Sequence, residues 1–87
     1  MSKRLNAFDK IYTNYVNDVF KYLMILTKNS DLAEELTQET FYKAYKNIDH
    51  FQGKSKMSVW LCQIAKNNYY SYLKKEKRIN HSDAMNK

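Results

Sequence analysis

The sequence is 87 residues long, which suits one small domain and is too short for a multidomain enzyme. It contains no proline, a single glycine and 15% aromatic residues. A many-stranded sheet needs turn residues that this chain lacks, whereas a helical core needs the large apolar side chains that it has. The composition therefore predicts an all-α fold.

The positive charge is concentrated in the second half of the chain. Fifteen Lys and Arg residues stand against nine Asp and Glu residues, giving a net charge of +6. Residues 1–49 contain seven basic and seven acidic side chains, whereas residues 50–87 contain eight basic and two acidic ones. Such an uneven distribution is expected of a surface that faces phosphate groups.

The sequence also predicts a cellular location. Cys62 is the only cysteine and cannot form an internal disulfide, and the first residues lack the apolar segment of a signal peptide. The longest nearly apolar stretch, residues 22–26, is far shorter than the roughly 20 residues that span a bilayer. We therefore expect a cytoplasmic protein without membrane insertion.

Apolar residues recur at three- and four-residue spacing and predict three main helices, at residues 6–27, 31–48 and 57–78. Ser30 or Asp31 is expected to cap the second helix. Residues 49–56 hold the only glycine and predict a loop before the last helix. The inner side of the last helix is expected to carry Leu61, Ile64, Ala65, Asn68, Tyr72 and Leu73. The predicted architecture is a compact bundle of these three helices.

The second helix has a polar outward face. At positions i, i+3, i+4 and i+7 it carries Glu35, Gln38, Glu39 and Tyr42. Two carboxylates with an amide and a ring can bind the arginines of a partner protein. An ordinary solvated helix face shows the same pattern, so the spacing alone leaves both interpretations open.

The third helix has a basic and aromatic outward face. The side chains at helical spacing on this face are Gln63, Lys66, Asn67, Tyr70, Lys74 and Lys77. Lysines neutralise phosphates, rings stack on exposed bases, and amides form hydrogen bonds with base edges. A lysine-rich helix end also complements the helix dipole, so nucleic-acid binding and plain solvation both remain possible.

Trp60 and Phe51 are the two other residues of interest. Trp60 is expected either to pack in the core or to offer a surface for an unstacked base. The structural alternative for Phe51 is that it only attaches the loop to the domain. The two histidines lie far apart in sequence without a matching cysteine and carboxylate set, so no metal site is expected. No nucleophile–base pair or phosphate-binding glycine loop is visible, so we expect neither enzymatic activity nor a cofactor.

Several ordered motifs resemble region 2 of bacterial sigma factors, and most closely the extracytoplasmic-function (ECF) class. They are DLAEELTQETF at residues 31–41, followed by Ala44, Asn47, Ile48, Phe51, Trp60, Leu61 and the IAKN string at residues 64–67. The resemblance covers about residues 7–78. Sigma factors are transcription-initiation subunits that give RNA polymerase its promoter specificity, so the resemblance implies a binding module rather than an enzyme.

The resemblance implies two binding surfaces. In the family, the helix with the QETF motif docks on the clamp helices of the polymerase β′ subunit, which would place Glu35, Gln38 and Glu39 in that contact with Tyr42 beside them. The following loop and last helix bind and melt the minus-ten promoter element and hold a flipped base of the non-template strand. The residues that fall where this pocket forms are Phe51, Gly53, Lys54, Ser55, Lys56 and Asn67. We expect the two surfaces to be opposed.

The expected partners are the RNA polymerase core, the non-template strand of promoter DNA and an anti-sigma factor. Residues 1–79 are expected to form the region 2 domain, and residues 80–87 a flexible tail or the start of a linker to region 4, the second domain that family members carry. The alternative is a helical protein-interaction module whose basic face is solvated or meets an acidic partner. A duplex-DNA repressor is disfavoured, because the loop at residues 49–56 is too long for the compact turn before a recognition helix.

Overall fold

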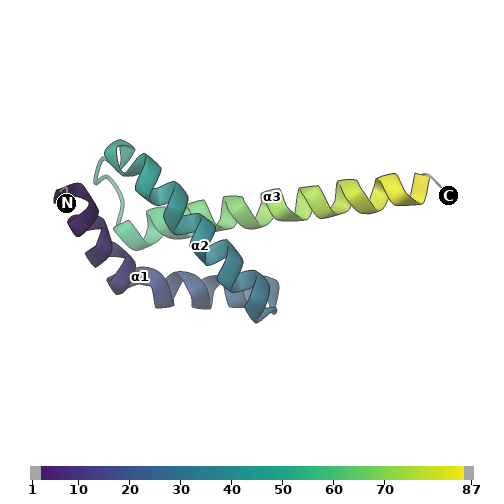
Figure 1. The fold of residues 1–87 in the computed structure, drawn as a ribbon, viewed down its shortest axis with the longest axis horizontal. Helices are drawn as coiled ribbons and strands as arrows, with labels where there is room; N and C mark the ends of the chain where they lie inside the picture. The colour runs from purple at the N-terminus through teal and green to yellow at the C-terminus, as the bar shows by residue number, and fades with distance from the viewer. Residues whose placement is uncertain (1–2, 86–87) are drawn as a thin grey trace.

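Three long helices make up the chain. The structure, a computed structural model, describes the backbone of residues 3–85 and the side chains of residues 8–77. The elements in chain order are α1 (Lys3–Thr27), α2 (Ser30–Asn47), the short 3₁₀ helix η1 (Ile48–His50) and α3 (Met57–Met85). Each long helix packs against the other two, and α3 continues past the turn that joins α1 to α2 (Figure 1). No strand occurs within residues 3–85, which confirms the all-α prediction.

The core lies between the faces that the three helices turn toward one another. Its buried apolar side chains are Phe8, Val19, Leu23, Ala33, Leu36, Phe41, Ala44, Leu61 and Ala65. The rings of Phe8 and Tyr12 meet the ring of Phe41 edge-on, with centroids 6.3 and 5.0 Å away. These edge-to-face contacts join α1 to α2, and each fully buried leucine adds about 2 kcal/mol of stability.

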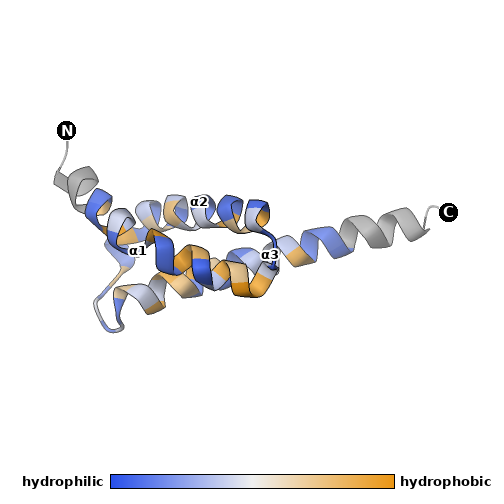
Figure 2. Ribbon diagram, turned by 90° about the horizontal axis from the view of Figure 1, so that it is seen from below, coloured by the Kyte–Doolittle hydropathy of each residue, from blue (hydrophilic) through white to orange (hydrophobic). Residues whose placement is uncertain are grey.

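Each helix is nevertheless amphipathic rather than apolar all round. Both hydrophobic and hydrophilic residues occur along all three helices (Figure 2). None of the helices in the described part of the chain is long and apolar enough to cross a membrane.

The turn between α1 and α2 differs from the prediction in its capping residue. Lys28 adopts a left-handed conformation with φ of 54°, and its N–H donates to the carbonyl oxygen of Met24 over 2.8 Å, which ends α1. Asn29 is therefore extended, and its Oδ1 accepts a hydrogen bond from the Leu32 N–H over 3.0 Å. The N-cap of α2 is thus Asn29 and not Ser30 or Asp31, because the left-handed turn at Lys28 brings Ser30 inside the helix.

The last helix is longer than predicted. α3 ends at Met85 instead of near residue 78, and no proline or glycine follows Gly53 to interrupt it. Residues 80–85, expected in a tail, are therefore helical, and residues 86–87 lie outside the described part of the chain. Leu73, expected on the inner side, is 43% exposed, so this part of the prediction was wrong.

Candidate nucleic-acid and protein interfaces

The residues predicted to bind a protein partner share one outer face of α2. All four side chains are exposed: Glu35, Gln38, Glu39 and Tyr42. Gln38 Nε2 donates a hydrogen bond to the Tyr12 hydroxyl over 3.3 Å, and the Lys46 ammonium lies 5.1 Å from the centre of the Tyr42 ring. Since the carboxylates and the ring are accessible, this face can receive cationic side chains of a partner.

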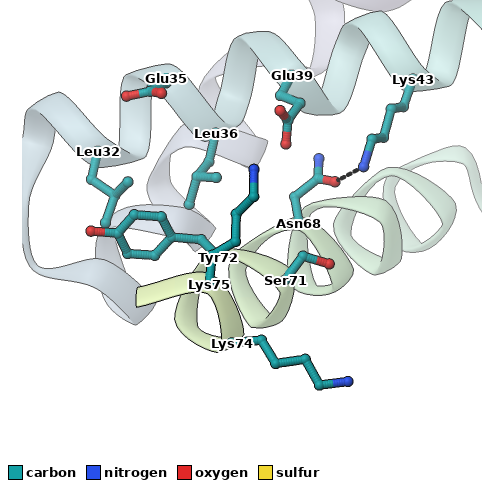
Figure 3. A pocket seen from close by; sticks show the side chains of 10 residues that line it. All are labelled: Leu32, Glu35, Leu36, Glu39, Lys43, Asn68, Ser71, Tyr72, Lys74 and Lys75. Carbon is teal, nitrogen blue, oxygen red and sulfur yellow. Dashed lines mark hydrogen bonds between the residues drawn. The ribbon is translucent and has the colours of Figure 1, made fainter. Parts of the chain in front are cut away.

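A groove of about 350 Å³ runs between α2 and α3. Figure 3 shows the side chains that line it, which are Leu32, Glu35, Leu36, Glu39, Lys43, Asn68, Ser71, Tyr72, Lys74 and Lys75. Lys75 reaches from α3 toward the side of α2 that carries Glu39, whereas Lys74 points away from α2 (Figure 3).

This groove changes the expected relation between the two surfaces. Glu35 and Glu39 belong to the set predicted to bind a protein, and Lys74 belongs to the set predicted to bind DNA, yet all three line the same groove. The two surfaces are therefore adjacent and not opposed. The sequence-based expectation was wrong on this point, because helical periodicity gives the outward side of each helix but not the angle between two helices.

A chain of side-chain hydrogen bonds crosses from α2 to α3 at the end of the groove. Lys43 Nζ donates to Asn68 Oδ1 over 2.6 Å. Asn68 Nδ2 donates to Thr40 Oγ1 over 3.1 Å, and Thr40 Oγ1 donates to the carbonyl oxygen of Leu36 over 2.7 Å. Asn68 is 2% exposed, and an unpaired amide at that depth costs about 1–3 kcal/mol. These hydrogen bonds therefore favour one register of α3 against α2.

A pocket of about 320 Å³ lies on the other side of the Lys43–Asn68 contact. It is lined by Lys43, Asn47, His50, Trp60, Ile64, Asn67 and Asn68. Trp60 and Asn67 were predicted to bind DNA, and the structure brings them together. Lys43, Asn47 and His50 were not assigned to this pocket from the sequence, because they come from the end of α2 and from η1. The polar residues Lys46, Asn47, Asp49 and His50 just before Phe51 were the available signal.

Phe51 attaches the loop before α3 to the first turn of that helix. Its ring centroid lies 5.0 Å from that of Trp60, with the planes inclined at 44°, and both rings are half-buried. Trp60 also packs against the core. It therefore both stabilises the fold and lines the pocket. The predicted loop residues that follow Phe51 are all exposed: Gly53, Lys54, Ser55 and Lys56.

Gly53 gives this loop its shape. Its φ is 73°, a left-handed conformation that glycine adopts without the strain of a side chain. A Cβ at this position would meet no atom within 4 Å, so the requirement for glycine comes from the backbone and not from crowding.

The predicted basic face of α3 does not converge on one cavity. Gln63, Asn67, Tyr70, Lys74 and Lys77 are exposed as expected, and Lys66 is half-buried. Gln63 and Lys66 border a third hollow, of about 320 Å³, together with Tyr22 of α1 and Cys62. The residues predicted to bind DNA thus divide among the Trp60 pocket, this hollow, the groove and open surface.

The hollow between α1 and α3 holds Cys62 and Tyr22, two titratable groups whose pKa values are displaced. Burial raises the pKa of the Cys62 thiol, and the Asp18 carboxylate raises it further. Burial also raises the pKa of the Tyr22 hydroxyl, with smaller contributions from Cys62 and Tyr70. Among the described residues, no three His, Cys, Asp or Glu side chains gather in a way that would hold a metal ion.

Comparison with known protein families decides the identity of this domain. The family model for Sigma-70 region 2 matches residues 11–79. The chain belongs to this family. The matched range runs from α1 through the polar face of α2 and the loop to the basic part of α3, so it includes every surface described above.

Relatives of this region 2 domain are ECF sigma factors. The ECF RNA polymerase sigma factor SigM of Bacillus subtilis (strain 168) is 46% identical over 72 residues, which cover 83% of this chain and 44% of the relative. The ECF RNA polymerase sigma factor SigW of the same organism is 34% identical over 79 residues, which cover 91% of this chain and 42% of the relative. The chain therefore spans less than half the length of these curated relatives.

A solved structure shares the fold of this region 2 domain. It is the sigma factor RpoE in complex with the anti-sigma factor NepR from Bartonella quintana. The TM-score is 0.78 at 28% sequence identity, and the match covers 90% of this chain and 49% of that chain.

Proposed function

We propose that this region 2 domain joins the RNA polymerase core to melted promoter DNA and acts as a binding module without catalysis. The outer face of α2 docks on the clamp helices of the polymerase β′ subunit. The pocket beside Trp60 and the loop after Phe51 hold the non-template strand of the minus-ten element. The family membership, the exposed polar face of α2 and the excess of lysines in residues 50–87 support this assignment.

The observation that carries the DNA part of the proposal is the pocket between α2, η1 and α3. It places the ring of Trp60 beside the exposed amide of Asn67, and the loop with Lys54 and Lys56 begins directly after Phe51, which packs on Trp60. Extruding a base costs a few kcal/mol, and stacking on an aromatic ring returns about 1–3 kcal/mol per base. An amide can bind the base edge, and the lysines neutralise the phosphates.

The polymerase part of the proposal rests on accessibility and charge. A partner can reach the exposed side chains on the outer face of α2 without any rearrangement of the fold. These side chains are Glu35, Gln38, Glu39 and Tyr42. Because Glu39 and Lys75 line the same groove, a polymerase helix docked on α2 would stand close to the basic side of α3. The polymerase then orients the DNA-binding surface and adds its own contacts, so we expect the isolated domain to bind single-stranded DNA weakly.

Binding of a labelled single strand by the isolated domain tests the DNA part. A strand with the non-template minus-ten sequence should bind more tightly than the same sequence as a duplex, and log K should fall by roughly 0.7 per phosphate contacted as log salt rises. Asn67→Ala should weaken binding, whereas Ser71→Ala, an exposed change one turn further along α3 outside this pocket, should not. Equal affinities for strand and duplex, or an unaffected Asn67→Ala variant, would contradict the proposal.

The alternative function, a protein-interaction module, is favoured by a different feature. The groove between α2 and α3 combines the apolar side chains of Leu32, Leu36 and Tyr72 with acidic and basic ones. The related RpoE is bound to an anti-sigma factor. We infer that an anti-sigma factor also binds this domain, in competition with RNA polymerase. If the groove is its binding site, Leu32→Glu should reduce its affinity and leave the strand affinity unchanged.

A further inference from the structure

Gln38 is exposed on the outer face of α2, yet its side chain is held by a residue of α1. Its Nε2 donates a hydrogen bond to the Tyr12 hydroxyl over 3.3 Å, across 26 positions of the chain. A glutamine on a solvated helix face ordinarily samples many rotamers and loses this freedom when it binds a partner. The contact with Tyr12 restricts the amide before any partner arrives.

Tyr12 is itself fixed by the core. Its side chain is half-buried and packs against the core cluster. Its ring meets the ring of Phe41 edge-on, with the centroids 5.0 Å apart and the planes at 71°, and Phe41 is only 4% exposed. A tyrosine placed in this way has an apolar body inside the protein and a hydroxyl that needs a polar partner. The hydroxyl therefore stands in a defined place beside α2.

We propose that Tyr12 is a positioning residue for polymerase binding, because its hydroxyl orients the Gln38 amide so that Oε1 is offered to the polymerase. The inference rests on the proposed function, which docks the outer face of α2 on the polymerase. Oε1 and Nε2 are bonded to the same carbon of a planar amide, so an engaged Nε2 fixes the direction of Oε1 as well. Since Gln38 is exposed, this oxygen remains an accessible acceptor.

The neighbours of Gln38 indicate which chemistry the oriented oxygen receives. Glu35, one turn earlier, and Glu39, the next residue, are exposed carboxylates. Together with Oε1 they present acceptors to a partner. A guanidinium group donates through five N–H groups in a rigid planar fork and can bind two acceptors at once. The oriented amide therefore suits an arginine of the polymerase that also binds one of the two carboxylates.

Removal of the hydroxyl alone separates this role from a contribution to folding. Tyr12→Phe keeps the ring, and with it the edge-on contact with Phe41, and removes only the oxygen that Gln38 binds. The broken hydrogen bond lies at the surface, where water can replace it. We therefore expect the urea midpoint of unfolding to stay the same.

The affinity of the dye-labelled chain for core RNA polymerase, measured by fluorescence anisotropy, tests the inference. Tyr12→Phe should weaken binding about threefold, the scale of one side chain that must be immobilised on association. Tyr15→Phe is the matched control, because it removes a hydroxyl from another half-buried ring of α1, and it should leave the affinity unchanged. Neither change should alter the affinity of the chain for a non-template minus-ten strand.

A double-mutant cycle distinguishes positioning from direct contact. Gln38→Ala should weaken binding, and Tyr12→Phe added to Gln38→Ala should have no further effect, because the amide to be oriented is absent. If the tyrosine hydroxyl bound the polymerase directly, Tyr12→Phe would cause the same loss with or without Gln38, and this result would overturn the inference.

Gln38→Glu tests which atom of the amide is used. The carboxylate keeps an outward oxygen, and the Tyr12 hydroxyl can hold it by donating instead of accepting. We expect this variant to bind core polymerase at least as tightly as the unaltered chain. Weaker binding would mean that the polymerase uses the N–H group of Gln38, which contradicts the proposed orientation.

The failure of the inference and the failure of the proposed function give different results. Full affinity of Tyr12→Phe, in an assay where Gln38→Ala weakens binding, overturns the inference and leaves the docking of α2 intact. Full affinity of both Gln38→Ala and the double variant with Glu39→Ala contradicts the docking itself and the inference with it.

Discussion

The rings of Phe51, at the start of the loop that precedes α3, and of Trp60, in the first turn of α3, pack 5.0 Å apart at an inclination of 44°. Phe51→Ala removes this contact and frees the loop. We expect a loss of about 1–2 kcal/mol in the free energy of unfolding, because the ring is only half-buried, and about tenfold weaker strand binding. Urea unfolding and strand titration measure the two effects. A variant that keeps full strand affinity would remove Phe51 from the site.

The polar face of α2 can be tested without disturbing the fold. Gln38→Ala with Glu39→Ala should weaken binding to an isolated β′ clamp-helix fragment at least tenfold, because hydrogen bonds to charged groups contribute about 1.5–3 kcal/mol. Both side chains are exposed, so the free energy of unfolding should change by less than about 0.5 kcal/mol.

Glu34→Ala provides the control for this face. Glu34 is an exposed carboxylate of the same helix but lies outside the groove that Glu35 and Glu39 line. We expect it to leave clamp-helix affinity nearly unchanged. Equal losses from Glu34→Ala and from the double variant would mean that only net charge matters, which would contradict a specific docking face.

The N-cap of α2 gives a prediction about stability alone. Asn29→Ala removes the acceptor for the Leu32 N–H and should cost about 1 kcal/mol, whereas Ser30→Ala should cost little, since Ser30 is exposed and inside the helix. Thermal unfolding of the two variants measures the difference, and strand binding should be the same in both. A larger loss from Ser30→Ala would contradict the observed cap.

The thiol of Cys62 should ionise at higher pH in the native chain than in the unfolded chain. Burial and then the Asp18 carboxylate raise its pKa, so the native state retains the proton over a range in which the unfolded state has lost it. Stability from this group is therefore lost as pH rises above the pKa of the unfolded thiol.

The pH dependence of alkylation measures this shift. The midpoint of the iodoacetamide rate profile should lie higher in buffer than in concentrated urea, because the thiolate is the reacting form. Asp18→Asn should lower the native midpoint, and Asp9→Asn, an exposed change elsewhere on α1, should leave it in place. A native midpoint at or below the value in urea would be inconsistent with the buried environment.

The sequence predicted the three helices and their inner faces because hydrophobic periodicity is a local property. Asn68, for example, was placed on the inner side of α3, and it is buried. Its partner Lys43 was not predicted. The two residues are 25 positions apart in the chain, and their contact depends on how α2 packs against α3. The left-handed Lys28 also escaped prediction, because glycine is the usual residue at such a helix end.

The sequence identified residues of the candidate site, but it did not predict how they are arranged in space. Trp60 and Asn67 were identified, and they line one pocket. Leu73 was expected inside, but its side chain is 43% exposed. The adjacency of the acidic and basic surfaces could not be derived from helical faces alone, since it depends on the packing of α2 on α3.

The central claim is that one small domain binds polymerase and an unpaired promoter strand at the same time. Fluorescence anisotropy of a labelled non-template minus-ten strand, titrated with core polymerase in the presence of the chain, tests it directly. The strand should be held more tightly by core polymerase and chain together than by either alone. Gln38→Ala with Glu39→Ala should abolish this gain, and Asn67→Ala should reduce it. A gain that survives both changes, or no gain at all, would contradict the account.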